Sequence, residues 1–217
     1  MKRIIVFLSI WLMLPAAVPA QQAGEVLIKN ATVMTATRGT LDGTDILIRN
    51  GKIVRVGKGI ASGAGAKVID ATGKYVTPGI IEAHSHSMLS AINEGSYSVT
   101  SMTRTRDMLD PGDISIYRAL AGGVTSALLL HGSANPIGGQ STTVKFKWGR
   151  PADDYPIADA PPGIKFALGE NVKRSSANVQ PGQTPRYPRT RMGTMETIRD
   201  ALRRARDYKQ AWDDFRA

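Results

Sequence analysis

A ten-residue stretch, Thr77 to His86 (TPGIIEAHSH), constrains the fold and chemistry of this chain more than any other segment. A Pro-Gly turn leads into a short apolar run, which is typical of a strand, and the run ends in His-x-His. Because side chains alternate between the two faces of a strand, His84 and His86 are expected to point the same way. Imidazole is the commonest metal ligand, so the pair suggests a metal site. The alternative is two ordinary polar residues in a loop.

Composition narrows the kinds of site that the chain can build. Its 217 residues are 42% hydrophobic and 21% charged, as in an ordinary globular protein. There is no cysteine, which excludes disulfides, zinc–thiolate sites and thiol nucleophiles. Besides the His-x-His pair the chain has one histidine, His131. A transition metal must therefore be held by histidine, carboxylate or a modified lysine.

The formal net charge of +10 comes largely from a basic region, residues 173–206. Such a run can attract nucleic acid or anionic membrane, but it can also be a solvated helix face or a covered surface. No nucleic-acid-binding module and no interleaved aromatic residues accompany it. We expect no nucleic-acid partner and keep a basic surface-binding protein as a rival interpretation.

The first 20 residues have the pattern of a secretory signal peptide. Met1-Lys2-Arg3 provides a positive start, and Ile4 to Leu14 is an apolar run shorter than the ~20 residues that span a bilayer. Val18-Pro19-Ala20 forms a small-residue cleavage site. This pattern predicts export to the periplasm or beyond, with no stable membrane anchor. An uncleaved anchor is the alternative.

Residues 21–78 are predicted to form a small β module of antiparallel strands, as a sheet or part of a sandwich. The strand signals are the β-branched runs Glu25–Asn30, Asp45–Arg49, Lys52–Val56 and Lys67–Asp70. Asn50-Gly51 predicts a two-residue hairpin, because a type I′ turn needs positive φ at both positions.

Residues 79–217 change to a strand–helix–strand pattern. After an irregular segment, Ser90 to Asp110, a helix should begin at Pro111-Gly112-Asp113 and end at Gly122-Gly123. Its apolar face is expected to carry Ile114, Tyr117 and Leu120. Val124 to Leu130 should then form a buried parallel strand that ends at His131. The βαβ unit predicts an α/β sheet or barrel.

The rest of the chain continues with strands and one long helix. Gly132 to Gln140 (GSANPIGGQ) is predicted as a Gly-rich loop at a strand end, where α/β folds place ligand-binding groups, although its glycine spacing is not that of a phosphate loop. Ser141–Trp148 and Gly163–Leu168 should be strands, and Thr194–Phe215 a basic amphipathic helix.

The strand that contains Lys165 has an informative alternation. Ile164, Phe166 and Leu168 would share one face, which leaves Lys165 and Ala167 on the other, facing a barrel interior. A bare ammonium is costly to bury. Carbamylation by carbon dioxide would make Lys165 an anionic bridge between two metals, and Glu170, just beyond the strand, could serve the same purpose. The alternatives are a lysine that snorkels or pairs with an acid, and a glutamate that caps a loop.

Three blocks of sequence together resemble the amidohydrolase superfamily, whose members are metal-dependent hydrolases built on a (β/α)8 barrel. The first block, LIKNATVM, DILIRNGKIVRVG and KVIDATGKYVTPGIIEAHSH, is similar to the family's β-sandwich and first barrel strand with its His-x-His. AGGVTSALLLHGSANPIGGQ resembles the second-strand region of the imidazolonepropionase-like, secreted branch, and PPGIKFALGENVKR resembles the strand with the bridging ligand. The resemblance covers essentially all of residues 25–210.

The resemblance implies hydrolysis of a C–N or similar bond, in an amide, cyclic amide or dipeptide, by a metal-activated water. It implies one or two divalent ions, with zinc the expected metal. His84 and His86 would bind the more buried metal, and Lys165 or Glu170 would bridge. His131 would lie near the pocket mouth and contact substrate, with a capped strand-end histidine as the alternative.

The chain also departs from the family pattern. A complete barrel needs ~250 residues, and the family takes further histidines and a catalytic aspartate from later strands. The expected fold is therefore α/β: a partial TIM-type (β/α)8 barrel in residues 79–217 after the β module, with its second half absent. The missing half, or a further copy of the chain, would be the partner. The rival interpretation is a non-catalytic half-barrel subunit or binding module.

The purified 217-residue chain is accordingly predicted to be inactive by itself. Amide and dipeptide hydrolysis should stay at the level of a protein-free control when zinc is added. Metal-dependent turnover that rises with the concentration of the chain would contradict this prediction.

Overall fold

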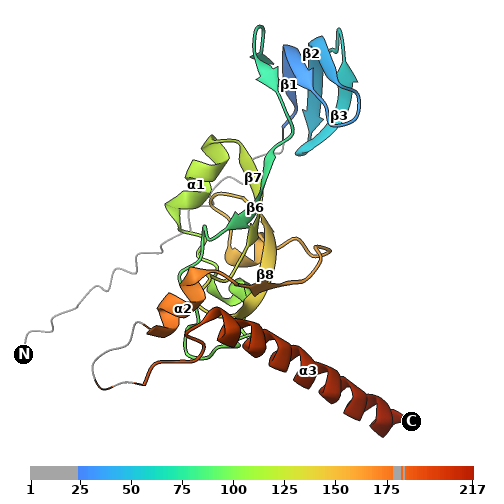
Figure 1. Ribbon diagram of the computed structural model, residues 1–217. Coiled ribbons are helices and arrows are strands. Elements are labelled where there is room, and N and C mark those ends of the chain that lie inside the picture. The colour runs from blue at the N-terminus through green and yellow to red at the C-terminus, as the bar shows by residue number, and fades with distance from the viewer. Residues whose placement is uncertain (1–23, 178–181, 183) are drawn as a thin grey trace, which may run out of the picture. The chain divides into compact units, whose positions relative to one another are not determined.

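The computed structural model describes residues 24–177, 182 and 184–217, and the chain divides into two compact units, Met1–Pro78 and Gly79–Ala217 (Figure 1). The predicted signal peptide lies outside the described residues. Within the described part of the chain, no helix is both long and apolar enough to cross a membrane.

The first unit is a five-stranded sheet in the order β3-β2-β1-β4, with β5 also paired to β1. Its strands are β1 (Val26–Met34), β2 (Thr40–Arg49), β3 (Lys52–Gly57), β4 (Lys67–Asp70) and β5 (Tyr75–Val76). The predicted hairpin is confirmed, because Asn50 and Gly51 have φ values of 50° and 72° and join antiparallel strands β2 and β3.

The prediction of antiparallel pairing was wrong for β4 and β5, which both run parallel to β1. The cause is the connection between β3 and β4, which lie at opposite edges of the main sheet. The chain has to cross the sheet, and Ile60 in this crossover packs against Leu27 and Leu47. The crossover delivers β4 to the free edge of β1 in the parallel direction.

Asp45 on β2 joins this crossover to the centre of the sheet. Its buried carboxylate accepts hydrogen bonds from the backbone N–H groups of Asn30 and Ile60, each at 2.9 Å. Asn30 has a positive φ of 58° and lies where the pairing of β1 with β2 shifts register. The bonds from Asn30 and Ile60 hold the pKa of Asp45 below its usual value, because both stabilise the charged carboxylate.

Replacing Asp45 with alanine is expected to destabilise the first unit. Two backbone N–H groups lose their acceptor, and an unsatisfied buried donor costs about 1–3 kcal/mol. The midpoint of urea unfolding should fall. Asp42→Ala is the matched control, because Asp42 is exposed on the same strand and its carboxylate accepts a surface hydrogen bond from the Thr32 hydroxyl. Equal midpoints for the two variants would contradict this role of Asp45.

The same carboxylate should make stability depend on pH. Its folded pKa is lowered, so its contribution is complete above the unfolded value of about 3.9 and is lost as pH falls through the folded pKa. The Asp45→Asn variant should lose less unfolding free energy than the wild type between neutral pH and about pH 3. An identical loss in both proteins would count against the assignment.

The second unit contains a four-stranded sheet in the order β6-β7-β8-β9. Its strands are β6 (Ile80–Ser85), β7 (Val124–Leu129), β8 (Ile137–Lys145) and β9 (Gly163–Phe166). The helices are α1 (Ile114–Ala121), α2 (Glu170–Ala177) and α3 (Arg191–Arg216), and short 3-10 helices span Thr105–Met108 and Ala152–Asp154. Parallel strands β6 and β7 are joined through α1, which confirms the βαβ unit (Figure 1).

Helix α1 has the predicted ends but only part of the predicted buried face. Ile116 is fully buried and Leu120 packs partly buried against the same core, whereas Ile114 and Tyr117 are exposed. The N-cap residue Asp113 accepts a bond from the backbone N–H of Ser115 and a second, at 2.8 Å, from that of Met88. The bond to Met88 fixes the rotation of the helix, so that Ile116 joins the core formed by β7, β8 and Met88.

Strand β8 begins earlier than predicted, because Ile137 to Gln140 belong to the strand and not to the Gly-rich loop. It is antiparallel to both β7 and β9, so β9 runs in the same direction as β6 and β7. The predicted strand Gly163–Leu168 ends at Phe166, and α3 begins three residues before the predicted Thr194. The architecture is a partial α/β barrel preceded by a β-rich module.

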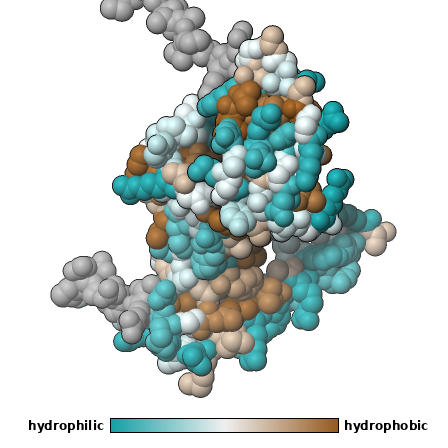
Figure 2. Space-filling view, turned by 90° about the horizontal axis from the view of Figure 1, so that it is seen from above, coloured by the Kyte–Doolittle hydropathy of each residue, from teal (hydrophilic) through white to brown (hydrophobic). Residues whose placement is uncertain are grey.

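Several apolar side chains of the second unit stay exposed among the described residues. Both edge strands carry them, with Ile81 70% exposed on β6 and Ile164 41% exposed on β9. Helix α3 is buried only near its start, at Gly193, Thr194 and Ile198. Figure 2 shows apolar residues interspersed with hydrophilic ones on the surface. This exposure is expected of a partial barrel with two open edges.

Candidate metal centre

The two histidines of the His-x-His motif lie together at the end of β6. His84 is the fifth residue of the strand, and His86 directly follows its last residue, Ser85. The two imidazole rings are 5.3 Å apart, centroid to centroid, in an edge-to-face arrangement. His84 is exposed and His86 is half-buried. The predicted pairing of the two side chains is therefore present.

The neighbouring strand fixes the tautomer of His86. Its Nδ1 lies 2.8 Å from the carbonyl oxygen of Leu130, the residue after β7. A carbonyl oxygen only accepts, so Nδ1 carries the proton and Nε2 of the neutral ring keeps a free lone pair. Metal-binding histidines are commonly oriented in this way, by a hydrogen bond from the other ring nitrogen. His86 is thus prepared to bind a metal through Nε2.

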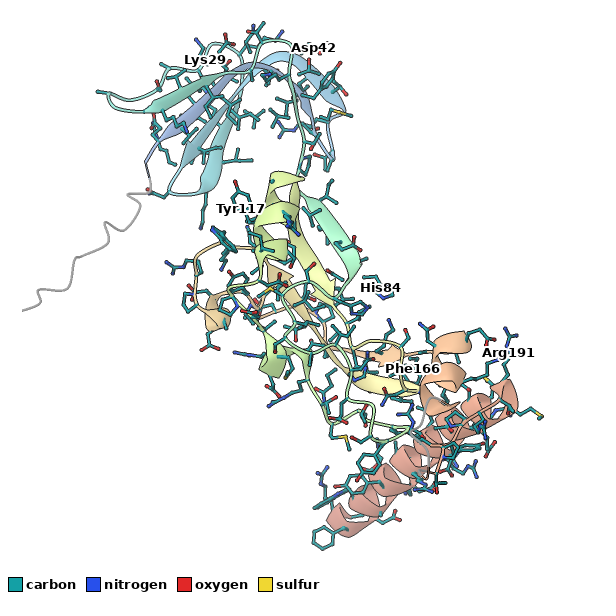
Figure 3. All side chains as sticks on the ribbon, turned by 90° about the vertical axis from the view of Figure 1, so that its left-hand side faces the viewer. Lys29, Asp42, His84, Tyr117, Phe166 and Arg191 are labelled. Carbon is teal, nitrogen blue, oxygen red and sulfur yellow. The ribbon has the colours of Figure 1, made fainter. Side chains whose placement is uncertain are left out.

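Strand β9 brings Lys165 to the same place. The Lys165 amine donates a hydrogen bond to Nε2 of His84 across 3.1 Å. Figure 3 shows His84 on β6 and, next in sequence to Lys165, Phe166 on β9. Burial lowers the pKa of the Lys165 amine. The side chain thus reaches the ring nitrogen that a metal ion would use.

The predicted alternation along β9 is also present. Ile164, Phe166 and Leu168 are 41%, 39% and 58% exposed, while Ala167 is 7% exposed and Lys165 is half-buried. Lys165 and Ala167 therefore share the inner face of the sheet. The exposed face is the one expected to carry barrel helices.

His84 and Lys165 line a polar hollow of about 510 Å³, together with Ser133, the segment from Phe166 to Gly169, Glu170 and Asn171. Glu170 begins α2 and forms an ion pair with Lys173 at 2.6 Å. Glu170 thus lies at the same hollow as His84 and Lys165. To bridge two metals, its carboxylate would have to give up the ion pair with Lys173. Its role as a bridging ligand stays a prediction.

A complete ligand set of the usual residue types is not formed by the described residues. Nowhere in the described part of the chain do three or more His, Cys, Asp or Glu side chains gather closely enough to hold a metal. Lys165 is in direct contact with His84. His84, His86, Lys165 and Glu170 remain predicted ligands.

His131 has a different environment. It is 5% exposed, its Nδ1 donates to the carbonyl of Gly132 at 2.9 Å, and its Nε2 accepts from the backbone N–H of Glu94 at 2.7 Å. Both ring nitrogens are therefore engaged, as expected of a histidine that closes a strand end. His131 also lines a second hollow of about 400 Å³, beside the loop from Ala91 to Glu94. Its contact with substrate stays a prediction.

The two glycines at the start of β8, Gly138 and Gly139, pack closely against His131. A Cβ added to Gly138 would lie 2.6 Å from Nδ1 of His131, and one added to Gly139 would lie 2.6 Å from the Thr103 hydroxyl. The Gly-Gly pair therefore reflects a close approach of β8 to the buried imidazole. It does not form a phosphate-binding loop.

Gly138→Ala is expected to destabilise the second unit. The new methyl group would overlap a buried ring whose two nitrogens are both held by hydrogen bonds, and overpacking of this kind costs about 1–3 kcal/mol. The thermal midpoint should fall accordingly. Gly95→Ala is the control, since Gly95 belongs to the same unit and a Cβ there meets nothing within 4 Å. A Gly138→Ala protein as stable as the control would contradict the packing role.

Sequence reasoning missed the residues that shape the surrounding loops. Ser133 was placed in a Gly-rich loop without a role, and Asn135 and Arg186 were not singled out. Asn135 is fully buried and donates to two backbone carbonyls, and Arg186 donates to three. Their partners are far away in sequence and, except for the Thr100 hydroxyl, are backbone atoms, so no motif could have revealed them.

Comparison with known proteins identifies the family. No protein-family model matches the chain. The amidohydrolase tasK of Hapsidospora irregularis is 35% identical over 193 residues, which is 79% of this chain and 19% of the relative. An amidohydrolase structure from Thermotoga maritima superposes with a TM-score of 0.75 at 38% identity, over 87% of this chain and 49% of that one.

The chain belongs to the amidohydrolase superfamily. A dihydroorotase of Trichlorobacter lovleyi is a further relative, 35% identical over 106 residues, which is 42% of this chain and 25% of that enzyme. The chain thus spans about half the length of the solved superfamily member and a quarter or less of the two curated relatives. The predicted resemblance to this superfamily is confirmed.

Proposed function

We propose that this chain supplies His84, His86 and Lys165 to the metal centre of a hydrolase that cleaves carbon–nitrogen bonds in an amide, cyclic amide or dipeptide. The observation that carries the proposal is the 3.1 Å contact between the Lys165 amine and Nε2 of His84, beside His86. Residues from the two edge strands of the sheet meet at this point. The names of the relatives, amidohydrolase and dihydroorotase, support the reaction class.

The donor set fits one or two divalent ions, with zinc the expected metal. His86 offers Nε2, because Nδ1 is held by Leu130. His84 offers Nε2 once Lys165 no longer donates to it. Reaction of the neutral Lys165 amine with carbon dioxide forms a carbamate and releases a proton. The amine that competes with a metal for Nε2 of His84 is thereby replaced by a group with an anionic oxygen ligand. Glu170 is the alternative anionic ligand in the same hollow.

A divalent metal bound here would polarise the carbonyl of the scissile bond and lower the pKa of a bound water to about 7. Neighbouring residues hold the two histidines in position. Leu130 holds the His86 ring in one tautomer, and the Glu82 carboxylate accepts a bond from the backbone N–H of His84 at 2.9 Å. Carbamylation of the half-buried Lys165 would place a negative charge on the β9 side of the hollow.

Zinc uptake tests the proposal directly. The chain should bind zinc in equilibrium dialysis with bicarbonate present, and His84→Ala, His86→Ala and Lys165→Ala should each reduce affinity at least tenfold. Lys145→Ala is the matched control, because Lys145 is exposed on the adjacent strand β8. With ¹³C-bicarbonate and zinc, a lysine carbamate signal should appear in the wild type and in Lys145→Ala, and disappear in Lys165→Ala.

Two results would contradict the proposal. One is zinc affinity that is unchanged by both histidine substitutions. The other is a carbamate signal that survives in Lys165→Ala. A third result would transfer the bridging role to Glu170. In that case zinc binding needs both histidines, gives no carbamate signal and is lost in Glu170→Gln.

A further inference from the structure

The loop between β7 and β8, residues 131–136, is held by bonds to its backbone on both sides of Ser133. The Gly132 carbonyl accepts a bond from Nδ1 of His131, and the Gly132 N–H donates to the carbonyl of Ile92 at 2.6 Å. The Ala134 N–H donates to the Asn93 side chain at 3.2 Å. The peptide group before Ser133 is therefore held by His131 of the same loop, and the peptide group after it by Asn93 of a different segment.

Arg186 completes this arrangement from far along the chain. Its half-buried guanidinium donates to the Ala134 carbonyl at 2.5 Å and to the Tyr97 carbonyl at 2.8 Å, and it also donates to the Gly95 carbonyl. The planar fork of an arginine suits several acceptors held in one plane. The guanidinium thus ties the loop that carries Ser133 to the segment from Glu94 to Tyr97.

Asn135 fixes the same two segments from inside. It is fully buried, and its side-chain NH₂ group donates to the carbonyls of Glu94 and Tyr97, each at 2.7 Å, and to the Thr100 hydroxyl at 3.1 Å. These donated bonds tie the loop to both segments, whereas the buried Oδ1 atom of Asn135 accepts no hydrogen bond from the described residues. Ser133 therefore lies in a loop whose backbone is defined from three directions.

Ser133 itself borders the hollow of the candidate metal centre. It is half-buried and lines the hollow that contains His84, Lys165 and Glu170. A serine hydroxyl both donates and accepts hydrogen bonds and carries no charge. An amide offers a carbonyl acceptor and an N–H donor, so the hydroxyl can pair with either part of an amide group. A rigid loop places this group without an ordering cost when the ligand binds.

We propose that Ser133 is a substrate-binding residue that hydrogen-bonds the amide group of the substrate beside His84 and Lys165. The proposal rests on the proposed function and names the substrate group that faces the loop after β7: the C=O or N–H of a cyclic or linear amide. Arg186 and Asn135 are positioning residues that hold the hydroxyl in place.

The test is a titration of the ¹⁵N-labelled chain with hydantoin, a small cyclic diamide, followed by amide chemical shifts. It is run with metal-free protein and with protein incubated with zinc and bicarbonate. The backbone signals of Gly132, Ser133 and Ala134 should shift and saturate in both. Ser133→Ala should weaken hydantoin binding about 3- to 10-fold, as expected for one net hydrogen bond. Ser133→Thr, which keeps a hydroxyl, should bind within twofold of the wild type.

Ser101→Ala is the matched control, since Ser101 is a half-buried serine of the same unit that does not line this hollow. Thermal midpoints of all variants should agree, which separates a contact with ligand from a structural role. Equal hydantoin affinity of Ser133→Ala and the wild type, or the absence of shifts at residues 132–134, would overturn the proposal. If zinc is not taken up, the proposed metal centre fails, while the metal-free titration still decides the role of Ser133.

Discussion

The contact between Lys165 and His84 is the constraint on which the second unit depends. The two residues come from β9 and β6, the two edge strands of a four-stranded sheet, and β7 and β8 lie between them. In a flat sheet these edges would be about 14 Å apart, given a strand spacing of ~4.8 Å. The two side chains can meet only if both project from the same face and lean across the sheet, as they do on the inside of a barrel wall. A strand register shifted by one residue would turn Lys165 outward and separate it from His84.

The elements between β6 and β9 also help to position the residues of the candidate metal centre. The carbonyl of Leu130, directly after β7, sets the His86 tautomer, and the loop that follows places Ser133 at the hollow. Helix α1 is held in rotation by the bond of Asp113 to Met88, so its buried face closes the core beneath β7. In the first unit, Asp45 has a comparable role, because one carboxylate ties a strand and a crossover together. In each unit, a single carboxylate thus ties together segments that are distant in the sequence.

The sequence predicted those parts of the molecule that depend on local chemistry. The Asn50-Gly51 turn follows from its need for positive φ, and the inward direction of Lys165 follows from the alternation of a strand. Pairings between distant segments were less accessible. The parallel direction of β4 depends on Ile60 packing on a face whose strands are far away in sequence, and the buried face of α1 depends on Met88. The loop around Ser133 is held through backbone carbonyls by Arg186, more than fifty residues away, and backbone acceptors leave no trace in the identity of a residue.

The central claim is that His84 and His86 bind one metal centre through Nε2. The most direct test is the ¹⁵N spectrum of the histidine side chains during addition of zinc. The account predicts that Nε2 of His84 and of His86 shift together as one site fills, that Nδ1 of His86 keeps its proton, and that His131 does not change. A proton on Nε2 of His86, or a response of His131 in place of the His84 and His86 pair, would contradict it.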